Sequence, residues 1–388
     1  MNIYTDYKEV NQKELEADID NIKDIIGNPG EDDYQHLLKM KLWTQHLNVF
    51  GFSLMTIILS YNHYISEISN FYLFIFLIIS SISLGIANVS EWANIAHPIL
   101  HGAYDKVPGI PKKYTKKVFA QGKRRIIDWF DWIKPEAWAY EHNIMHHYHL
   151  GENDDPDNVE KNMVWLHKAK IPMFLKYAFI YVFAMTWKFT YYAPNTLRIL
   201  ENKRRIKDKE EPTDSYDFSL KTKNGKELWF SYYLPYGLYK FLFIPSIFLF
   251  INTTSALLVL LTMLMAEIYA NLHSFLVIVP NHSAEDIYQF STPHKSQGEY
   301  YLRQIMGSVN YNTGNDLIDF GHGFLNYQIE HHLFPNMPSS FYQKMQPLVK
   351  EVCKKHNLEY RQENVFKRMW MTIELMVGKT KVKRIDGI

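Results

Sequence analysis

The chain has 388 residues, and its 42 lysines and arginines nearly balance its 41 aspartates and glutamates, for a formal net charge of +1. This balance excludes a protein that binds nucleic acid through bulk positive charge. The single cysteine excludes a disulfide framework and a metal cage made of cysteines. The mean hydropathy of −0.25 is typical of a soluble protein, but 24 Phe, 27 Tyr and 9 Trp also suit a membrane interface. The average therefore combines segments of different character.

The first 40 residues are polar and rich in acids, among them Glu31, Asp32 and Asp33. They lack the basic start and the apolar run of a signal peptide. We therefore expect a polar N-terminal segment over residues 1–40 that stays in the cytoplasm, followed by one membrane domain over residues 41–388.

Two long stretches contain neither lysine nor arginine, the first from Leu42 to Asp105 and the second from Phe241 to His294. Each holds two apolar runs separated by a short polar break, and a helix needs about 20 apolar residues to cross a hydrocarbon core about 30 Å thick. This pattern predicts an all-α integral membrane protein with four transmembrane helices in two hairpins. The predicted spans are about residues 44–61, 71–89, 229–251 and 255–279.

The basic residues gather outside these hairpins. Residues 111–125 carry seven bases and no acid, residues 198–227 carry sixteen charged side chains, and the C-terminus ends with a further basic run. By the positive-inside rule, the hairpin tips face away from the cytoplasm. A helical cytoplasmic cap is then expected over residues 90–228 and 280–388. The alternative is a soluble helical protein with large buried hairpins, but two base-free hairpins between basic segments favour the membrane protein.

One further segment, Pro172 to Ala193, is apolar enough to span a membrane but contains Lys176 and Lys188. If it crossed, the histidines that follow Val279 would lie on the opposite side of the membrane from those that precede the segment. We therefore expect it to lie in the interface with its aromatic side towards the membrane.

The histidines are clustered beside the predicted spans. On an α-helix, residues four apart lie about 40° apart on one face, whereas adjacent residues point about 100° apart. A pair four apart therefore converges, and an adjacent histidine can reach a second site. One zinc site needs only three or four ligands, so this larger number of imidazoles indicates two metal ions. Nitrogen ligands that leave exchangeable coordination positions suit iron in oxygen chemistry. The clustered histidines are His97 and His101 in H-P-I-L-H, His142, His146 and His147 in H-N-I-M-H-H, His282 in P-N-H-S, and His331 and His332 in Q-I-E-H-H.

Two of these motifs resemble those of the membrane fatty-acid desaturase family. The run W-A-Y-E-H-N-I-M-H-H at 138–147, followed by D-D-P-D at 154–157, is similar to the second histidine box of bacterial lipid desaturases. The run L-N-Y-Q-I-E-H-H-L-F-P-N-M-P at 325–338 is similar to the third box of front-end and related acyl desaturases. The resemblance covers about residues 88–360. It implies a diiron enzyme that uses dioxygen as co-substrate, and two external electrons, to desaturate a fatty acyl chain.

The family pattern implies that all eight clustered histidines are iron ligands. Gln328 stands where many members have histidine, although glutamine is usual in the front-end branch, and it is a candidate weak ligand or orienting group. His273 is a second candidate for the ligand between the second and third boxes, where we prefer His282. Further candidates for groups that orient the ligands are Asp154, Asp155, Asp157, Glu330 and His322. For the aspartates, a solvated acidic loop is the alternative.

Glu267 lies within the last predicted span, where an acid is a functional candidate by default. Two interpretations remain open from the sequence: it lines a substrate channel, or it pairs with a polar neighbour.

The resemblance also implies partners. The substrate would be an acyl-lipid, an acyl-CoA or an acyl-carrier thioester, in contact with membrane lipids and without nucleic acid. Many front-end desaturases carry a fused haem domain with an H-P-G-G motif, which this sequence lacks, so we expect a separate electron donor, a ferredoxin or a cytochrome. The basic residues 111–125 would either dock an acidic donor or set the topology and meet anionic head groups.

Other functions fit parts of the pattern. A diiron hydroxylase of a lipid, sterol or carotenoid would share the scaffold and differ only in its product. A non-catalytic membrane receptor or a zinc-dependent lipid hydrolase would share the helical frame and differ in metal content.

Overall fold

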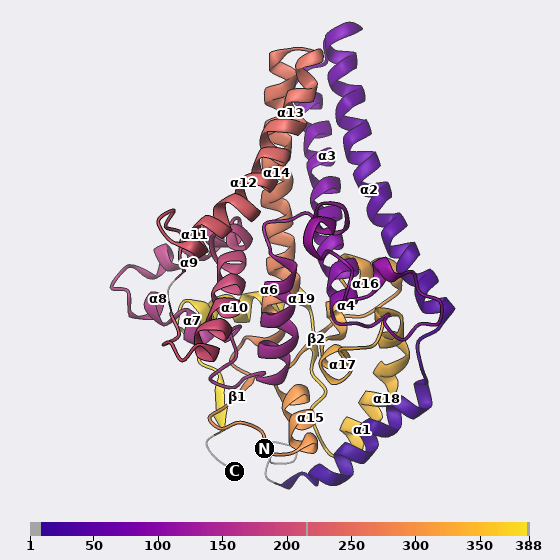
Figure 1. Cartoon of the computed structure of the whole chain (residues 1–388), viewed down its shortest axis with the longest axis vertical. Coiled ribbons are helices and arrows are strands. Elements are labelled where there is room, and N and C mark those ends of the chain that lie inside the picture. The colour runs from indigo at the N-terminus through magenta and orange to yellow at the C-terminus, as the bar shows by residue number, and fades with distance from the viewer. Residues whose placement is uncertain (1–8, 215, 386–388) are drawn as a thin grey trace.

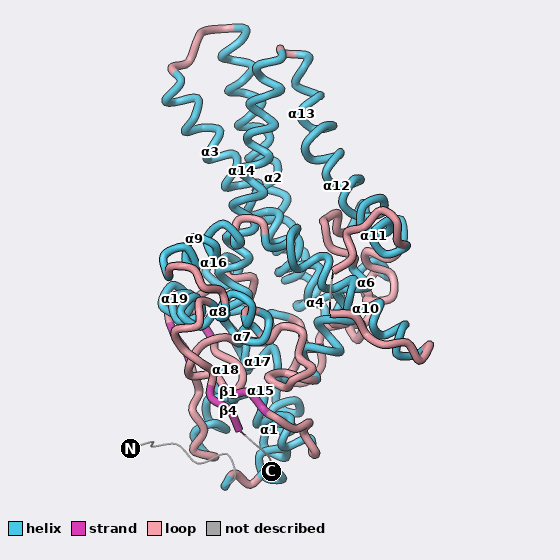
Figure 2. The backbone as a smooth tube through the Cα atoms, turned by 90° about the vertical axis from the view of Figure 1, so that its left-hand side faces the viewer, coloured by secondary structure: helices cyan, strands magenta, loops and turns pink. Residues whose placement is uncertain are grey.

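The computed structural model describes residues 9–214 and 216–385, which are mostly helical. Figure 1 shows a narrow stem of long helices rising from a broad cap of shorter ones, and Figure 2 shows the same division after a quarter turn. Four helices, of 28 to 34 residues, are long and apolar enough to cross a membrane. At 1.5 Å per residue each exceeds a hydrocarbon core of about 30 Å, so their ends can reach into the cap. The predicted fold class is confirmed.

The first hairpin of the stem is made of two regular helices. α2 (Glu31–Tyr64) begins inside the segment predicted to be a polar N-terminus, and α3 (Asn70–Ser90) returns towards the cap. α3 continues without a break through a π-helical segment, Glu91–Ala96, into α4 (His97–Leu100). The second membrane helix therefore ends on the first histidine cluster.

The second hairpin begins with an irregular helix. Pro235 and Pro245 start two of its short α-helical parts, and because proline has no N–H group, the regular hydrogen-bond ladder is interrupted there. Its parts are α11 (Lys223–Glu227), the π-helix Leu228–Tyr233, α12 (Leu234–Leu238), the π-helix Tyr239–Phe243, α13 (Ile244–Ile247) and the 3₁₀ turn Phe248–Phe250. The returning helix, α14 (Thr253–Ile278), passes into the 3₁₀ turn Val279–His282.

α3 packs between α2 and α14 in the stem. Two glycines of the stem allow this close packing, since a Cβ on Gly51 would lie 2.7 Å from Leu84 Cγ and a Cβ on Gly85 would lie 2.6 Å from Tyr269 Cδ1. Small residues at helix contacts are typical of membrane proteins. Large apolar side chains such as Phe50 are exposed on the outside of the stem, as expected for a surface that faces lipid.

The cap is built from short helices on both sides of the stem's lower end. α1 (Gln12–Ile26) packs on α15 (Gln297–Met306) and α18 (Tyr342–Lys355) at the base of the cap. The remaining described α-helices are α1 (Gln12–Ile26), α5 (Arg125–Asp128), α6 (Pro135–Tyr140), α7 (Val159–Asn162), α8 (Val164–Lys168), α9 (Met173–Ala184), α10 (Ala193–Lys207), α15 (Gln297–Met306), α16 (Asp316–Gly321), α17 (Gln328–Leu333), α18 (Tyr342–Lys355) and α19 (Val365–Met376). Two small parallel pairs of strands complete it: β1 (Tyr288–Phe290) with β4 (Lys383–Ile385), and β2 (Asn310–Tyr311) with β3 (Gln362–Glu363).

The ambiguous apolar segment folds as two helices with a turn between them. α9 has 12 residues, which at 1.5 Å per residue span about 18 Å, too little to cross a membrane. A π-helix, Lys188–Tyr192, follows it and leads into α10. Phe174 and Val182 on α9 are exposed, so the helix has an apolar surface available for an interface.

Glu267 on α14 pairs with polar neighbours. Its carboxylate forms an ion pair with Lys240 and accepts hydrogen bonds from Trp132 Nε1 at 2.8 Å and from Asn271 Nδ2 at 3.2 Å. Glu267 does not line the apolar cavity beside the histidines. The structure therefore favours the second interpretation of the sequence, in which this acid pairs with polar neighbours.

Candidate metal centre

π-helical turns set the direction of the first two histidine clusters. One π-helix, Glu91–Ala96, leads into the first cluster, and another, Glu141–His146, contains much of the second. In a π-helix the backbone hydrogen bond joins residues five apart, and here the His147 N–H donates to the His142 carbonyl. The two imidazoles therefore face each other, with 3.2 Å between their Nε2 atoms. An α-helical turn would instead pair His142 with His146, as the sequence predicted.

Five buried imidazoles form the first group. Each of the five residues offers one ring nitrogen, and these five nitrogens all lie within 4.8 Å of one another. The Nε2 atom of His97 is 3.1 Å from that of His331 and 3.1 Å from that of His142. Two nitrogens bound to one ion at about 2.1 Å each lie about 3 Å apart at a right angle, so these spacings suit neighbouring ligands of one metal. The five residues are His97, His101, His142, His147 and His331.

Three more imidazoles form the second group, again with ligand atoms within 4.8 Å of one another: His146, His282 and His332. The rings of His282 and His332 are 4.4 Å apart between centroids, and that of His146 is 4.9 Å from His282. Gln328 lies beside this group, with its Nε2 2.9 Å from His282 Nε2, while its Oε1 accepts a hydrogen bond from Asn281 at 2.7 Å.

Each adjacent pair of histidines is divided between the two groups. His146 and His332 belong to the group of three, and their neighbours His147 and His331 belong to the group of five. This division follows from the angular offset of consecutive helical residues, as predicted from the sequence. All eight predicted ligands are thus brought into two neighbouring groups.

Hydrogen bonds to the outer ring nitrogen hold four of the imidazoles. Such a bond fixes the ring orientation and leaves Nε2 as the inward nitrogen. Nδ1 of His146 lies 3.0 Å from an Asp155 carboxylate oxygen, and Nδ1 of His282 lies 2.9 Å from the Gly307 carbonyl. Nδ1 of His331 lies 2.9 Å from the Tyr342 hydroxyl, and Nδ1 of His332 lies 2.8 Å from Gln304 Oε1.

The environment favours neutral imidazoles with free lone pairs. Burial, together with the neighbouring histidines, lowers the pKa of His101, His142, His147 and His331 well below the usual value. The buried Nε2 of His101 has no hydrogen-bond partner among the described residues, and neither has that of His332. A buried polar atom without a partner is costly, and a bound cation would give it one. The donor set therefore fits metal ions that prefer nitrogen ligands.

Two residues of the acidic loop after the second cluster, Asp155 and Asp157, contact the site. Asp155 is buried against His146, whereas Asp154 is exposed, and both were candidates from the sequence. Asp157 lies 3.7 Å from His146 Nδ1 and can join His142 and His146 around a metal ion. Burial raises the pKa of Asp157 to about 6, against the opposing effect of His146. Burial would lower the pKa of His146, but Asp155 reverses this and raises it.

Three other sequence candidates lie apart from the imidazole groups. Glu330 accepts hydrogen bonds from Asn310 at 2.7 Å and Tyr360 at 2.6 Å, and no described histidine is bonded to it. Nε2 of His273 is 2.7 Å from the Gly321 carbonyl, and Nδ1 of His322 is 2.9 Å from the Ile318 carbonyl. The two histidines thus bond backbone carbonyls and Glu330 bonds two other side chains, and these contacts leave all three outside the two groups.

The sequence alone did not single out several residues that contact the site. Glu141 is fully buried, receives a hydrogen bond from Tyr192 at 3.3 Å, and has a pKa raised well above its usual value by burial. Its position directly before His142 was the only signal. Gln304 and Tyr342 lie 28 and 11 residues from their histidine partners, and no motif connects them to the boxes.

An apolar cavity borders both imidazole groups. His97 and His142 from the first group, and His146 and His282 from the second, form part of its wall. Most of the remaining wall is aromatic or aliphatic. It includes Trp92, Trp138, Phe183, Trp187, Tyr192, Phe275, Ile278 and Met376. The arrangement can hold an apolar chain against the nitrogen-rich centre.

Comparison with known proteins agrees with this arrangement. The chain is 26% identical over 317 residues to Delta(5) fatty acid desaturase A of Dictyostelium discoideum, covering 77% of this chain and 61% of that protein. It is 26% identical over 290 residues to the NADPH-dependent stearoyl-CoA 9-desaturase of Mycobacterium tuberculosis, covering 72% and 62%. A shorter match, 48% identical over 97 residues, covers 23% of this chain and 21% of the acyl-lipid (9-3)-desaturase of Borago officinalis.

The chain thus spans about three fifths of the length of the first two relatives. No solved structure matches it significantly. A sequence model of the family described as fatty acid desaturase matches residues 72–364, which is more than half of the chain. The chain belongs to the fatty acid desaturase family.

Proposed function

We propose that the protein is a diiron, dioxygen-dependent desaturase that introduces a double bond into the acyl chain of a fatty acid carried on a lipid or thioester. The observation that carries the proposal is that histidines of both imidazole groups form part of the wall of the apolar cavity. Names of the relatives, which include a stearoyl-CoA 9-desaturase and an acyl-lipid desaturase, support the same substrate class.

The two imidazole groups would hold the two metal ions. The first ion would be bound by residues of the group of five, and the second by His146, His282 and His332, with Gln328 beside it. Nitrogen ligands suit iron, and zinc sites rarely need more than four ligands. Two bound iron ions would supply the activation of dioxygen that removal of hydrogen from an unactivated chain requires.

The protein's own residues bind and orient the chain and keep water out. The aromatic cavity wall, with Trp138 beside His142 and Phe275 beside Trp187, gives methylene groups a dry surface, and exclusion of water protects reactive species. Asp155 and Tyr342 hold the imidazoles of His146 and His331 in place. The acyl chain would enter with its head group on the cytoplasmic face, so that the distance from head group to centre sets the position of the double bond.

The reaction needs electrons from outside. One –CH2–CH2– unit, one O2, two electrons and two protons give one –CH=CH– unit and two waters. The substrate supplies only half of the four electrons that reduce dioxygen. A separate one-electron carrier, a ferredoxin or a cytochrome, would supply the other half.

Expression in a host of known lipid composition tests the proposal. Fatty acids are profiled by mass spectrometry for the wild type, for His146→Ala, and for His46→Ala, which removes an exposed histidine of the stem. We expect a new unsaturated species in the wild type and in His46→Ala, and its loss in His146→Ala. Full activity of His146→Ala would overturn the proposal.

The same samples separate the alternatives. A product heavier by one oxygen, in place of one lighter by two hydrogens, would identify a hydroxylase. Metal analysis of the purified protein should give about two irons per chain. Zinc alone would favour a hydrolase, and little metal of any kind would favour a receptor.

A further inference from the structure

Five exposed lysines form a surface on the cap: Lys112, Lys113, Lys116, Lys117 and Lys123. We call them the lysine surface. No acid occurs in the sequence between Asp105 and Asp128. None of the five makes an ion pair with an acid in residues 9–214 or 216–385, whereas Arg124, next along the chain, pairs with Asp128 at 2.7 Å. The lysine surface is therefore a concentrated positive charge without an ion-pair partner among the described residues.

The loop that carries the lysine surface is anchored. Tyr114 is buried, and its ring centroid lies 5.7 Å from that of Tyr34 on α2. The Nζ atom of Lys41 lies 5.0 Å from the same Tyr114 ring centroid. The backbone N–H of Lys116 donates to Asp105 at 3.0 Å. A fixed loop presents its charges without paying the full entropy of ordering on binding.

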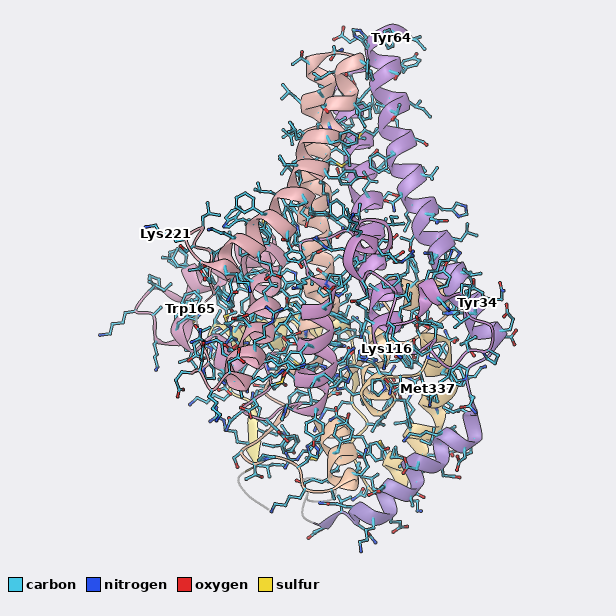
Figure 3. The ribbon with its side chains drawn as sticks, viewed as in Figure 1. Tyr34, Tyr64, Lys116, Trp165, Lys221 and Met337 are labelled. Atoms are coloured by element: carbon cyan, nitrogen blue, oxygen red, sulfur yellow. The ribbon has the colours of Figure 1, made fainter. Side chains whose placement is uncertain are left out.

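The lysine surface lies next to the first imidazole group. The Lys116 side chain crosses Gly102, where an added Cβ would lie only 3.0 Å from Lys116 Cδ. Gly102 has φ +79° and directly follows His101, which belongs to the group of five. Only Gly102 therefore separates exposed Lys116 from the imidazole of His101, and Figure 3 labels Lys116 on the cap.

Its position favours a protein partner over a membrane. Tyr34, which contacts the loop, lies ten residues before Thr44, where the predicted span begins, and ten helical residues are about 15 Å. In Figure 3, Lys116 is drawn below Tyr34, on the side of the view away from the stem's tip at Tyr64. The attraction of anionic lipid head groups falls off over a Debye length of about 8 Å. The exposed Ile126 and Ile127, which line a pocket with stem residues, are better placed to meet lipid.

We infer that the lysine surface docks the acidic face of a one-electron carrier protein. The inference rests on the proposed function, because the two electrons of that reaction define the need for such a partner. Two reduced carriers bind in turn, each gives one electron to the centre, and each leaves oxidised by one electron. Complementary charge speeds such encounters and sets their salt dependence.

The test uses the full-length protein in neutral nanodiscs and a plant-type [2Fe–2S] ferredoxin, kept reduced by NADPH and its reductase, as the probe. One variant reverses four charges of the lysine surface: Lys112→Glu, Lys113→Glu, Lys116→Glu and Lys117→Glu. The matched control reverses four exposed lysines elsewhere on the cap: Lys207→Glu, Lys209→Glu, Lys221→Glu and Lys223→Glu. Ferredoxin binding and the rate of iron reduction are measured at low and high salt.

We expect at least about a tenfold loss of binding and of reduction rate at low salt in the lysine-surface variant, shrinking at high salt. The control variant should match the wild type. Photoreduction with deazaflavin, a small reductant that needs no docking, should be equal in all three, which shows that the fold and the irons are intact. Equal binding and reduction by ferredoxin in all three proteins would overturn the inference.

A lipid role has its own outcome. If the lysine-surface variant lost affinity for vesicles containing phosphatidylserine while its reduction by ferredoxin stayed normal, the surface would be a membrane contact and the inference would be wrong. Failure of the proposed function would give a third result, because the wild type would then form no double bond with either reductant. Ferredoxin binding would still be measured in that case, so the docking inference could be judged separately.

Discussion

At the scale of single residues, groups outside the two imidazole groups hold their rings in place. Tyr342 is buried, and its hydroxyl lies 2.9 Å from Nδ1 of His331. A hydrogen bond at this nitrogen favours the tautomer whose Nε2 lone pair faces the group of five. Tyr342 is therefore a positioning residue for His331 and is not expected to contact substrate.

Tyr342→Phe should reduce iron affinity or desaturation by about 10- to 100-fold while leaving the fold intact, because the ring remains and only the hydroxyl is lost. Iron retained after dialysis against a chelator, together with product yield, measures the effect. Tyr311→Phe is the matched control, since the Tyr311 hydroxyl is buried but has no hydrogen-bond partner among the described residues. Equal losses in the two variants would show that the hydroxyl of Tyr342 does not position His331.

The sequence predicted the eight histidines that come together, because ligand motifs are local and short. It did not distinguish the acids around them. Asp154 and Asp155 are adjacent and chemically identical, yet only Asp155 reaches His146; the direction of each side chain depends on the turn that the loop adopts. Gln304 and Tyr342 come from other helices, and contacts between distant elements leave no local pattern in one sequence.

At the scale of elements, the four membrane helices were predictable because apolar runs free of charge have few other stable environments. The π-helical turns were not. A π-turn inserts one residue into an α-helix at a local energetic cost, and the periodicity of the sequence does not reveal it. This one residue changes which histidines of the second cluster face each other, since His142 meets His147 in place of His146.

The close contact between α3 and α14 positions histidines from both helices. α3 leads into His97, and α14 leads into His282. Gly85→Ala should lower the melting temperature by a few degrees and reduce iron content, because the new methyl group would lie 2.6 Å from Tyr269 and 2.9 Å from the Ala266 carbonyl.

The control for this variant is Gly237→Ala in the irregular third helix. There the new methyl group would lie 3.6 Å from Trp132, an ordinary contact. Both variants gain helix propensity equally. A melting temperature for Gly85→Ala equal to that of Gly237→Ala would contradict the proposed role of the α3–α14 contact.

At the scale of the whole molecule, buried charges join the stem to the cap. Lys188 in the cap forms an ion pair with Asp131 at 2.7 Å, with each side chain only 1% exposed. Its Nζ also donates to Asn88 on α3 at 3.0 Å, and its backbone N–H donates to Asn271 on α14. The same lysine lies 5.6 Å from the Trp92 ring, which lines the apolar cavity. This pair therefore supports the cavity wall from behind.

Removal of one partner leaves a buried charge uncompensated. Lys188→Met and Asp131→Asn should each cost about 3–5 kcal/mol, and the double variant should cost clearly less than their sum. Melting temperatures in detergent give the order of stabilities. Lys355→Met, which removes an exposed ion pair with Glu14 and Asp18, should have little effect. Strict additivity of the two buried substitutions would contradict a coupled pair.

The orientation of the molecule in the membrane follows from the distribution of its bases. Lysines and arginines crowd the cap, while the tip of the first hairpin, from Ile65 to Ser69, carries none. The cap is therefore expected in the cytoplasm, with the two hairpin tips on the far side. Cys353 is completely buried, so the natural protein should give almost no background in a thiol-labelling experiment.

Ser66→Cys at the hairpin tip and Lys221→Cys on the cap, both at exposed positions, report the two sides. In intact cells a membrane-impermeant maleimide should label only Ser66→Cys, and after permeabilisation it should label both. Labelling of Lys221→Cys in intact cells would reverse the topology. It would also move both imidazole groups and the lysine surface away from the cytoplasm, where the proposed electron carrier would be reduced. Under the proposed function, the orientation of the stem therefore decides whether a cytoplasmic carrier could supply electrons to the two imidazole groups.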